Sequence, residues 1–248
     1  MDIKEKDFSY ILYKIILDKF LNNFKTFNQV LENDDNDFVI LRHDVEFDLE
    51  RALTMARIEN EHSVNSIYFI QVCSNAYNPF SPINLARIKE IKSLGHQIGL
   101  HFYSSHLLDY DWNKIEVELI KQNNLLEDLL GCDVSVFSFH RPKEILLENR
   151  NNIIAGLINA YGEKFFDYSD NPTNVKYISD SLHLWRFGHP LEEYPQNKTQ
   201  LLFHPDYWSL DGLNELDNFK RLIDENATEF KETLNSETKN FSRFKKMV

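Results

Sequence analysis

Two carboxylic acids stand two positions apart where a short apolar run ends. Asp44 and Glu46 follow the segment Phe38–Leu41, with only Arg42 and His43 before them. Side chains at positions i and i+2 of an extended segment point to the same side, so both carboxylates face one cleft if this segment is a strand. Such a pair can hold a cation or move a proton. The structural alternative makes Asp44 a hydrogen-bond acceptor and Glu46 a capping residue for the next helix.

Three further segments that read as strands end in an imidazole. The histidines are His101, His140 and His204, which follow Gln97–Leu100, Val134–Phe139 and Gln200–Phe203. The carboxyl ends of parallel strands lie on one rim, where α/β proteins bind ligands and carry out chemistry. Imidazole nitrogen combined with a carboxylate is a donor set that suits zinc, and His106 is a further imidazole in reach of His101. A lone histidine is more often structural, so the convergence of several strand ends carries the interpretation.

Other side chains next to these positions have both a functional and a structural interpretation. The fork of Arg141 suits a carboxylate, of the substrate or of the site, but also a salt bridge at the rim. Trp208, close to His204, offers a ring that can stack on a sugar or pack in the core. Asp180 and Trp185 form a looser cluster that either walls the cleft or packs beneath it.

The order of elements predicts an α/β fold with mainly parallel strands. Helical and extended patterns alternate almost throughout, which is typical of such a sheet. Asp48, Ser81 before Pro82, and Gly131 are helix-end signals. The predicted helices cover about 8–24, 113–130, 153–161 and 213–234, besides those that begin at 48 and 81. We expect one domain over 1–248, with a helical lead-in over 1–36 and a tail over 236–248 that can fray.

Composition limits the function classes. The chain has 248 residues, 42% of them hydrophobic, and a formal net charge of −12. That charge argues against nucleic acid and against an anionic membrane surface as the main partner. Two cysteines, a charged N-terminus and no long apolar run predict a cytoplasmic protein without a membrane span. Nucleotide-binding glycine loops and a G-x-S-x-G serine-hydrolase elbow are both missing from the sequence.

Four strings in this order resemble the polysaccharide deacetylases of the NodB type, carbohydrate esterase family four. They are Arg42-His43-Asp44-Val45-Glu46, Gly95-His96-Gln97-Ile98-Gly99-Leu100-His101, Phe137-Ser138-Phe139-His140-Arg141-Pro142 and Leu201-Leu202-Phe203-His204-Pro205. The resemblance covers roughly 37–208 and is closest to divergent members associated with bacterial surface-polysaccharide gene clusters. It implies a distorted (β/α) barrel. It also implies a metal-dependent hydrolase that removes an acyl group, expected to be acetyl, from an N-acylated sugar. The expected metal is zinc.

The resemblance also implies roles for individual residues. Asp44 matches the catalytic base and Glu46 a metal ligand, while a second register puts His43 at the base position and Asp44 on the metal. His101 matches the first metal histidine. His106 matches the second with one extra residue in the spacing, and His140 is the alternative third ligand. Arg141 matches the third-motif arginine, which is expected to orient Asp44 and lower its pKa. His204 matches the general acid, and Asp180 and Trp185 are nearest to the fourth motif. The residues expected to contact the substrate are His43, His140, Trp185 and Trp208.

Two other functions fit the same residues. The lengthened spacing from His101 to His106 and the Glu at position 46 are also compatible with a non-catalytic relative that binds a sugar without turnover. The same constellation can serve a metal hydrolase of another C–N bond, in a formamide or a cyclic amide.

Overall fold

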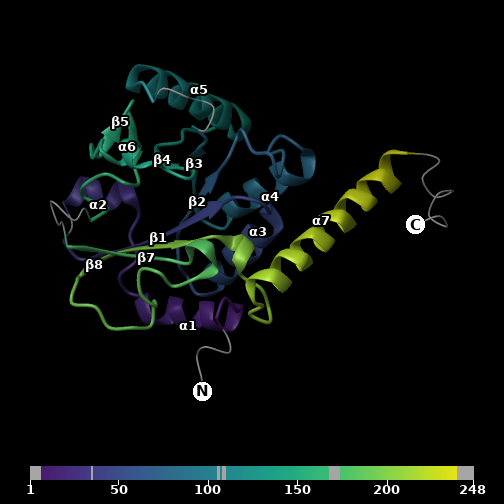
Figure 1. Cartoon of the computed structure of the whole chain (residues 1–248), viewed down its shortest axis with the longest axis horizontal. Helices are drawn as coiled ribbons and strands as arrows, with labels where there is room; N and C mark the ends of the chain where they lie inside the picture. Colours follow the sequence, from purple (N-terminus) through teal and green to yellow (C-terminus); the bar gives the residue numbers. More distant parts are fainter. Residues whose placement is uncertain (1–6, 35, 105–106, 108–109, 168–173, 239–248) are drawn as a thin grey trace.

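One eight-stranded sheet organises the molecule (Figure 1). The computed structural model describes residues 7–34, 36–104, 107, 110–167 and 174–238. The strand order is β5-β6-β4-β3-β2-β1-β8-β7, and all neighbours are parallel except β5 and β6. The strands are β1 (Phe38–Val45), β2 (Ile67–Ile70), β3 (Gln97–Phe102), β4 (Val136–Phe139), β5 (Ile153–Ile154), β6 (Leu157–Asn159), β7 (Val175–Ser179) and β8 (Lys198–Phe203).

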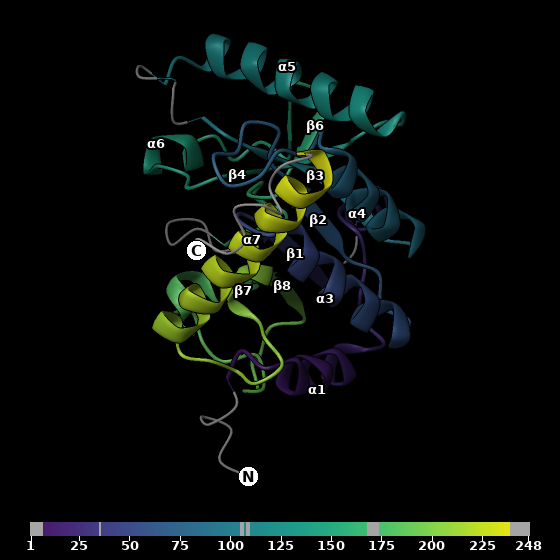
Figure 2. The ribbon, with the colours of Figure 1, turned by 90° about the vertical axis from the view of Figure 1, so that its right-hand side faces the viewer.

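Helices cover the outside of this sheet, and α5 and α1 lie toward opposite ends of the molecule (Figures 1 and 2). The α-helices are α1 (Tyr10–Phe20), α2 (Phe27–Asn33), α3 (Leu49–Glu61), α4 (Pro82–Ser93), α5 (Trp112–Leu130), α6 (Glu144–Leu147) and α7 (Glu215–Glu237). Two short 3₁₀ helices, η2 (Ser181–His183) and η3 (Pro205–Tyr207), follow β7 and β8. The far end of α7 projects away from the body of the molecule in Figure 1.

The sheet curls into an open barrel. Ile158 of β6 and Val175 of β7, which come from strands near opposite ends of the sheet, belong to one buried apolar cluster. In the described part of the chain, β5 and β7 remain the two edges and do not pair with each other. The prediction of a distorted (β/α) barrel with mainly parallel strands is therefore confirmed.

Strand β1 lies inside the sheet, between β2 and β8, and is buried along its whole length. Its side chains alternate between two environments, as the pleat of a strand requires. Phe38 and Ile40 pack inside the curl, whereas Val39 and Leu41 pack outward against the cluster that contains α1 residues. The same alternation puts Arg42 and Asp44 inside the curl and His43 outside it.

The helix-end signals in the sequence are confirmed. Asp48 accepts hydrogen bonds from the backbone N–H groups of Glu50 and Arg51, which caps α3 immediately after the β1 loop. Ser81 caps α4, whose first residue is Pro82, and Gly131 ends α5 in the left-handed region at φ 66°. Short caps of this kind keep the loops between strands and helices short and thereby fix the direction of each strand end.

Close packing at Gly99 of β3 gives a test of the core. A Cβ at this position would lie 2.5 Å from Cε1 of Phe69 and 2.9 Å from Cδ1 of Ile67. We expect Gly99→Ala to lower the free energy of unfolding by about 1–3 kcal/mol, because an added methyl group forces well-packed side chains to shift. Urea unfolding followed by circular dichroism measures the change. A loss below about 0.5 kcal/mol would show that the Phe69 ring has room to move.

Two predicted helices were wrong in type or extent. Residues 153–161, predicted as a helix, form the antiparallel pair β5 and β6. Ala155 and Gly156 between them both have positive φ, which produces a tight hairpin turn that a helix cannot contain. The predicted helix over 8–24 is α1 alone, and the separate helix α2 begins at the Thr26 cap within the 1–36 lead-in.

Among the residues that the structure describes, no helix has both the length and the apolar character needed to cross a bilayer. Most of the tail predicted to fray, from 239 onward, lies outside the described residues, and α7 extends to Glu237.

Candidate metal centre

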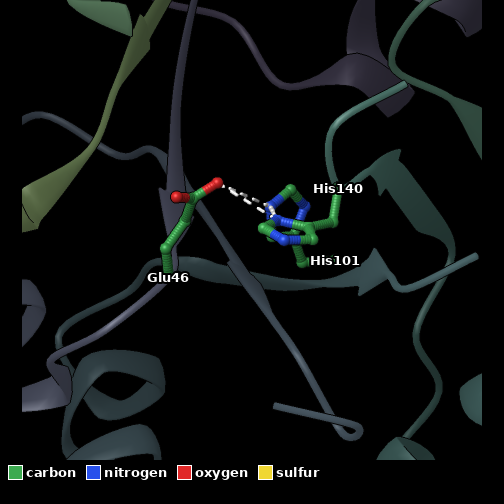
Figure 3. Close-up of side chains that lie close together, drawn as sticks. All are labelled: Glu46, His101 and His140. Carbon is green, nitrogen blue, oxygen red and sulfur yellow. Dashed lines mark hydrogen bonds and ion pairs between the residues drawn. The ribbon is translucent and has the colours of Figure 1, made fainter. Parts of the chain in front are cut away.

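Three side chains from the ends of strands β1, β3 and β4 converge on one point (Figure 3). Glu46 directly follows β1, His101 lies in β3 and His140 directly follows β4. Oε1 of Glu46 is 3.1 Å from Nδ1 of His140 and 3.8 Å from Nε2 of His101. The two imidazole nitrogens are 3.2 Å apart. In the described part of the chain, these residues form the one group of three His, Cys, Asp or Glu side chains with a metal-binding arrangement.

The backbone around Glu46 is held in place by two neighbouring side chains. The carboxylate of Asp206 accepts hydrogen bonds from the N–H groups of Glu46 and Phe47, at 3.3 and 3.2 Å. The Tyr77 hydroxyl donates to the carbonyl of Val45 at 3.0 Å. These contacts fix the turn after β1, so the Glu46 side chain is directed toward His101 and His140 rather than toward the N-terminus of α3.

The second histidine is positioned by its neighbours in the sheet. The His140 N–H donates to the Phe102 carbonyl at 2.9 Å, which continues the pairing of β4 with β3. The Tyr103 ring stacks on the His140 imidazole with centroids 5.2 Å apart. The Gln71 amide lies 3.3 Å from Nδ1 of His140. The ring is therefore held on its face and at its edge.

The charge state of this group fits a bound divalent cation. Burial raises the pKa of Glu46, but hydrogen bonds from His101 and His140 outweigh it and hold the pKa well below the usual range. The carboxylate is thus ionised. Nδ1 of His101 is buried without a hydrogen-bond partner in the described residues. Two imidazole nitrogens and one carboxylate oxygen are the donor set of a catalytic zinc site with a position left for water.

Asp44 lies beside this group but has different partners. Its Oδ2 accepts hydrogen bonds from Nη2 of Arg42 at 2.9 Å and from Oγ of Ser138 at 3.3 Å. Oδ1 is buried without a partner among the described residues. Burial alone would raise the pKa of Asp44. The positive charge of Arg42 and the His101 imidazole have a larger, opposite effect, so the pKa lies below its ordinary value. The side chain is therefore an ionised carboxylate, and its Oδ1 is free to accept a further hydrogen bond.

His204 follows β8 and is bound to Asp180, which follows β7. Nδ1 of His204 is 2.6 Å from Oδ1 of Asp180, whose Oδ2 accepts hydrogen bonds from the His204 N–H and from Nε1 of Trp208. Burial alone would lower the pKa of His204. The negative charge of the Asp180 carboxylate has a larger, opposite effect, and the pKa is raised to about 9. The imidazole is therefore protonated at neutral pH, with Nε2 on the side away from Asp180.

The structure does not pair Arg141 with Asp44 in the part of the chain that it describes. Its side chain is exposed, its φ is +49°, and in the described residues no ion pair joins it to Asp44. The arginine that contacts Asp44 is Arg42, which sequence reasoning missed. The available signal was a charged residue inside an otherwise apolar strand, two positions before Asp44.

His43 lies on the other side of β1 from Asp44. It is fully buried, its Nε2 is 2.6 Å from Oε1 of Glu59, and its ring stacks on Tyr68. Glu59 of α3 also accepts hydrogen bonds from the hydroxyls of Tyr13 and Ser66. This outward position corrects the expectation of substrate contact and does not favour the register that puts His43 at the base position.

Of the two tryptophans expected to line a sugar cleft, Trp208 packs in the core and Trp185 is half-buried against it. Trp208 has no exposed surface and donates its indole N–H to Asp180. Trp185 stacks on Phe8 and packs against the same apolar cluster. Trp208 therefore supports the Asp180–His204 pair from beneath. His106, the other predicted metal histidine, lies outside the described residues.

The chain is similar to solved structures of carbohydrate esterase family four, the family that the sequence motifs resemble. A mutant of a CE4 family pseudoenzyme from Bacillus anthracis, with restored enzymatic activity, is 15% identical over 77% of this chain and 64% of that one, with a TM-score of 0.48. A family 4 carbohydrate esterase from Bacillus anthracis is 16% identical over 88% and 86%, with a TM-score of 0.45. A CE4 esterase from Streptococcus mutans is 14% identical over 73% and 78%, with a TM-score of 0.44. The chain thus spans less than two thirds of the first of these.

Protein-family models and curated proteins yield no match to the sequence.

Proposed function

We propose that this protein is a metal-dependent hydrolase that removes an acyl group, acetyl, from an N-acylated sugar in surface-polysaccharide biosynthesis. The observation that carries the proposal is the convergence of Glu46, His101 and His140 next to an ionised Asp44 with one free oxygen. An amide carbonyl is a weak electrophile and its nitrogen a poor leaving group. A site that cleaves it needs a base, an acid and an electrophile together, and this rim offers candidates for all three.

Each residue has one task in this proposal. Glu46, His101 and His140 hold the metal, which we assign as zinc from the nitrogen and oxygen donors. When bound, zinc polarises the carbonyl and lowers the pKa of water. Asp44 accepts the proton of the attacking water through Oδ1. His204 donates its proton to the departing nitrogen, and Asp180 keeps that imidazole charged and correctly oriented until it does so.

Acyl release from a panel of sugars tests this function. The purified, zinc-loaded protein is incubated with N-acetylated and N-formylated sugars, free, nucleotide-linked and oligomeric, and acetate and formate are measured separately. Acetate release that stops in EDTA and returns with zinc supports the proposal. Formate release alone points to the hydrolase of another C–N bond. Sugar binding without any release points to a non-catalytic carbohydrate-binding protein.

The Asp180–His204 pair predicts a pH dependence. Because the pKa of His204 is raised to about 9, the acid is protonated below that pH, and kcat/KM should fall as the pH rises through about 9. Asp180→Asn keeps a hydrogen-bond acceptor but removes the charge that raises this pKa. We expect the alkaline limb to move to lower pH by roughly 1–2 units. The pH profile of kcat/KM measures it, with exposed Asp224→Asn as the control. An unmoved limb would exclude His204 as the acid.

A further inference from the structure

We propose that Arg42 is the positioning residue for Asp44, and that it does the work which the motif resemblance assigns to Arg141. Arg42 holds one oxygen of the Asp44 carboxylate so that the other faces the reacting water. This inference rests on the proposed function, because it gives the direction of Asp44 a purpose in catalysis.

The Arg42 guanidinium is bound on several sides at once. Its Nη1 donates to Oε1 of Gln200 at 2.9 Å. Its Nη2 lies 2.9 Å from Oδ2 of Asp44, 3.0 Å from Oγ of Ser138 and 2.9 Å from the Tyr161 hydroxyl. Gln200 belongs to β8, Ser138 to β4, and Tyr161 follows β6. The planar group is thus fixed by separate elements of the barrel, which only a forked donor can contact together.

Packing removes the remaining freedom of this side chain. Arg42 has no exposed surface, and its guanidinium carbon lies 4.7 Å from the Tyr161 ring centroid and 5.5 Å from that of Phe69. Gln200 is itself held, since its amide nitrogen donates to the carbonyls of Ala160 and Phe165. A guanidinium anchored in this way transfers its fixed position to the carboxylate that it binds.

The contact with Asp44 is one-sided. Arginine and carboxylate often pair through two parallel hydrogen bonds that occupy both carboxylate oxygens. Here the donors from Arg42 and Ser138 both go to Oδ2, and Oδ1 has no partner among the described residues. A pair that served stability alone would gain from closing the second oxygen. The observed arrangement instead leaves a buried acceptor whose direction is set by the anchored one.

The two arginines can be compared by substitution in the zinc-loaded protein. For Arg42→Gln we expect kcat for acetate release to fall about 100-fold, with KM within threefold and zinc content unchanged, because orientation of the base is lost while the metal ligands are untouched. Arg42→Lys keeps the charge without the fork, and we expect it to restore about tenfold of that loss. Arg141→Gln should reduce kcat less than tenfold, and Arg57→Gln, an exposed arginine of α3, is the neutral control.

Several outcomes would overturn the assignment. They are a folded Arg42→Gln protein with kcat within threefold of the wild type, or a larger loss in Arg141→Gln than in Arg42→Gln. If Arg42→Gln does not fold, Arg42→Lys carries the test, and an unchanged kcat there contradicts positioning by the fork. If the wild type releases no acyl group, the proposed function fails. In that case, crystal structures of the wild type and of Arg42→Lys test the positioning role. If the Asp44 carboxylate has the same orientation in both structures, Arg42 does not position it.

Discussion

Acyl release should fall at least about 1,000-fold in Asp44→Asn, with the fold and the bound zinc retained. The amide of asparagine has almost the shape of the carboxylate but cannot take a proton from water. Its oxygen can still accept the hydrogen bonds of Arg42 and Ser138. The buried Arg42 loses its negative partner, so we also expect a loss of stability of about 3–5 kcal/mol.

Three measurements on Asp44→Asn separate catalysis from folding. Acetate release gives the activity, metal analysis of the purified protein gives the zinc content, and urea unfolding gives the stability. Asp128→Asn, an exposed aspartate of α5, is the matched control and should behave like the wild type. If Asp44→Asn keeps its zinc and more than about a tenth of the activity, Asp44 is not the base. If it loses the zinc instead, Asp44 is a metal ligand.

Replacing His101 with alanine should remove the metal and, with it, the activity. The loss leaves one imidazole and one carboxylate, and we expect zinc affinity to fall by at least about 100-fold. The measurement is isothermal titration with zinc, together with acetate release before and after treatment with EDTA. His62→Ala, at the end of α3, is the control because its ring contacts the Ile58 carbonyl and His62 is not part of the metal group.

The same titration identifies the remaining ligand. We expect His140→Ala to lose zinc in the way that His101→Ala does, because Nδ1 of His140 already lies 3.1 Å from Glu46. Equal loss in His106→Ala would add a fourth protein ligand. Loss in His106→Ala with full retention in His140→Ala would show that the spacing-based assignment was the right one and would remove His140 from the proposal. Unchanged zinc affinity in His101→Ala would remove the site altogether.

The rim of the sheet was predictable because its signals are local. An apolar run followed by a charged residue marks a buried strand and its end, and Asp48 or Gly131 marks a helix end within a few residues. Parallel strands joined by helices then bring their carboxyl ends to one rim without further information. The sequence alone therefore predicts that Glu46, His101 and His140 lie on one rim of the sheet.

The partners of these residues were not predictable in the same way because they come from distant parts of the chain. The contacts of Arg42 with Ser138, Tyr161 and Gln200 span 96, 119 and 158 residues. No local sequence pattern indicates whether Arg42 or Arg141 contacts Asp44. The hairpin of β5 and β6 was missed for another reason. A short apolar stretch that contains Ala155 and Gly156 is equally compatible with a short helix and with two short strands.

The placement of His43 could have been derived from strand alternation alone. If Asp44 faces the site, its neighbour along the strand must face the other way. The resemblance to a family suggests a functional role for the whole string from Arg42 to Glu46. The pleat of the strand determines which of these side chains face the site. Trp208 is a similar case, since an aromatic ring next to a strand end packs beneath the site as readily as beside it.

Adjacent residues of β1 bind this interior strand to the layers on both of its faces. Arg42 ties it to strands and loops across the interior, and His43 ties it through Glu59 to the helices outside. A strand that is bound on both faces cannot shift or bend much without breaking the charged contacts of Arg42 on one face and of His43 on the other. Any opening that admits or releases a bulky molecule must therefore come from the surrounding loops. The segment that carries Asp44 stays in place during such a movement.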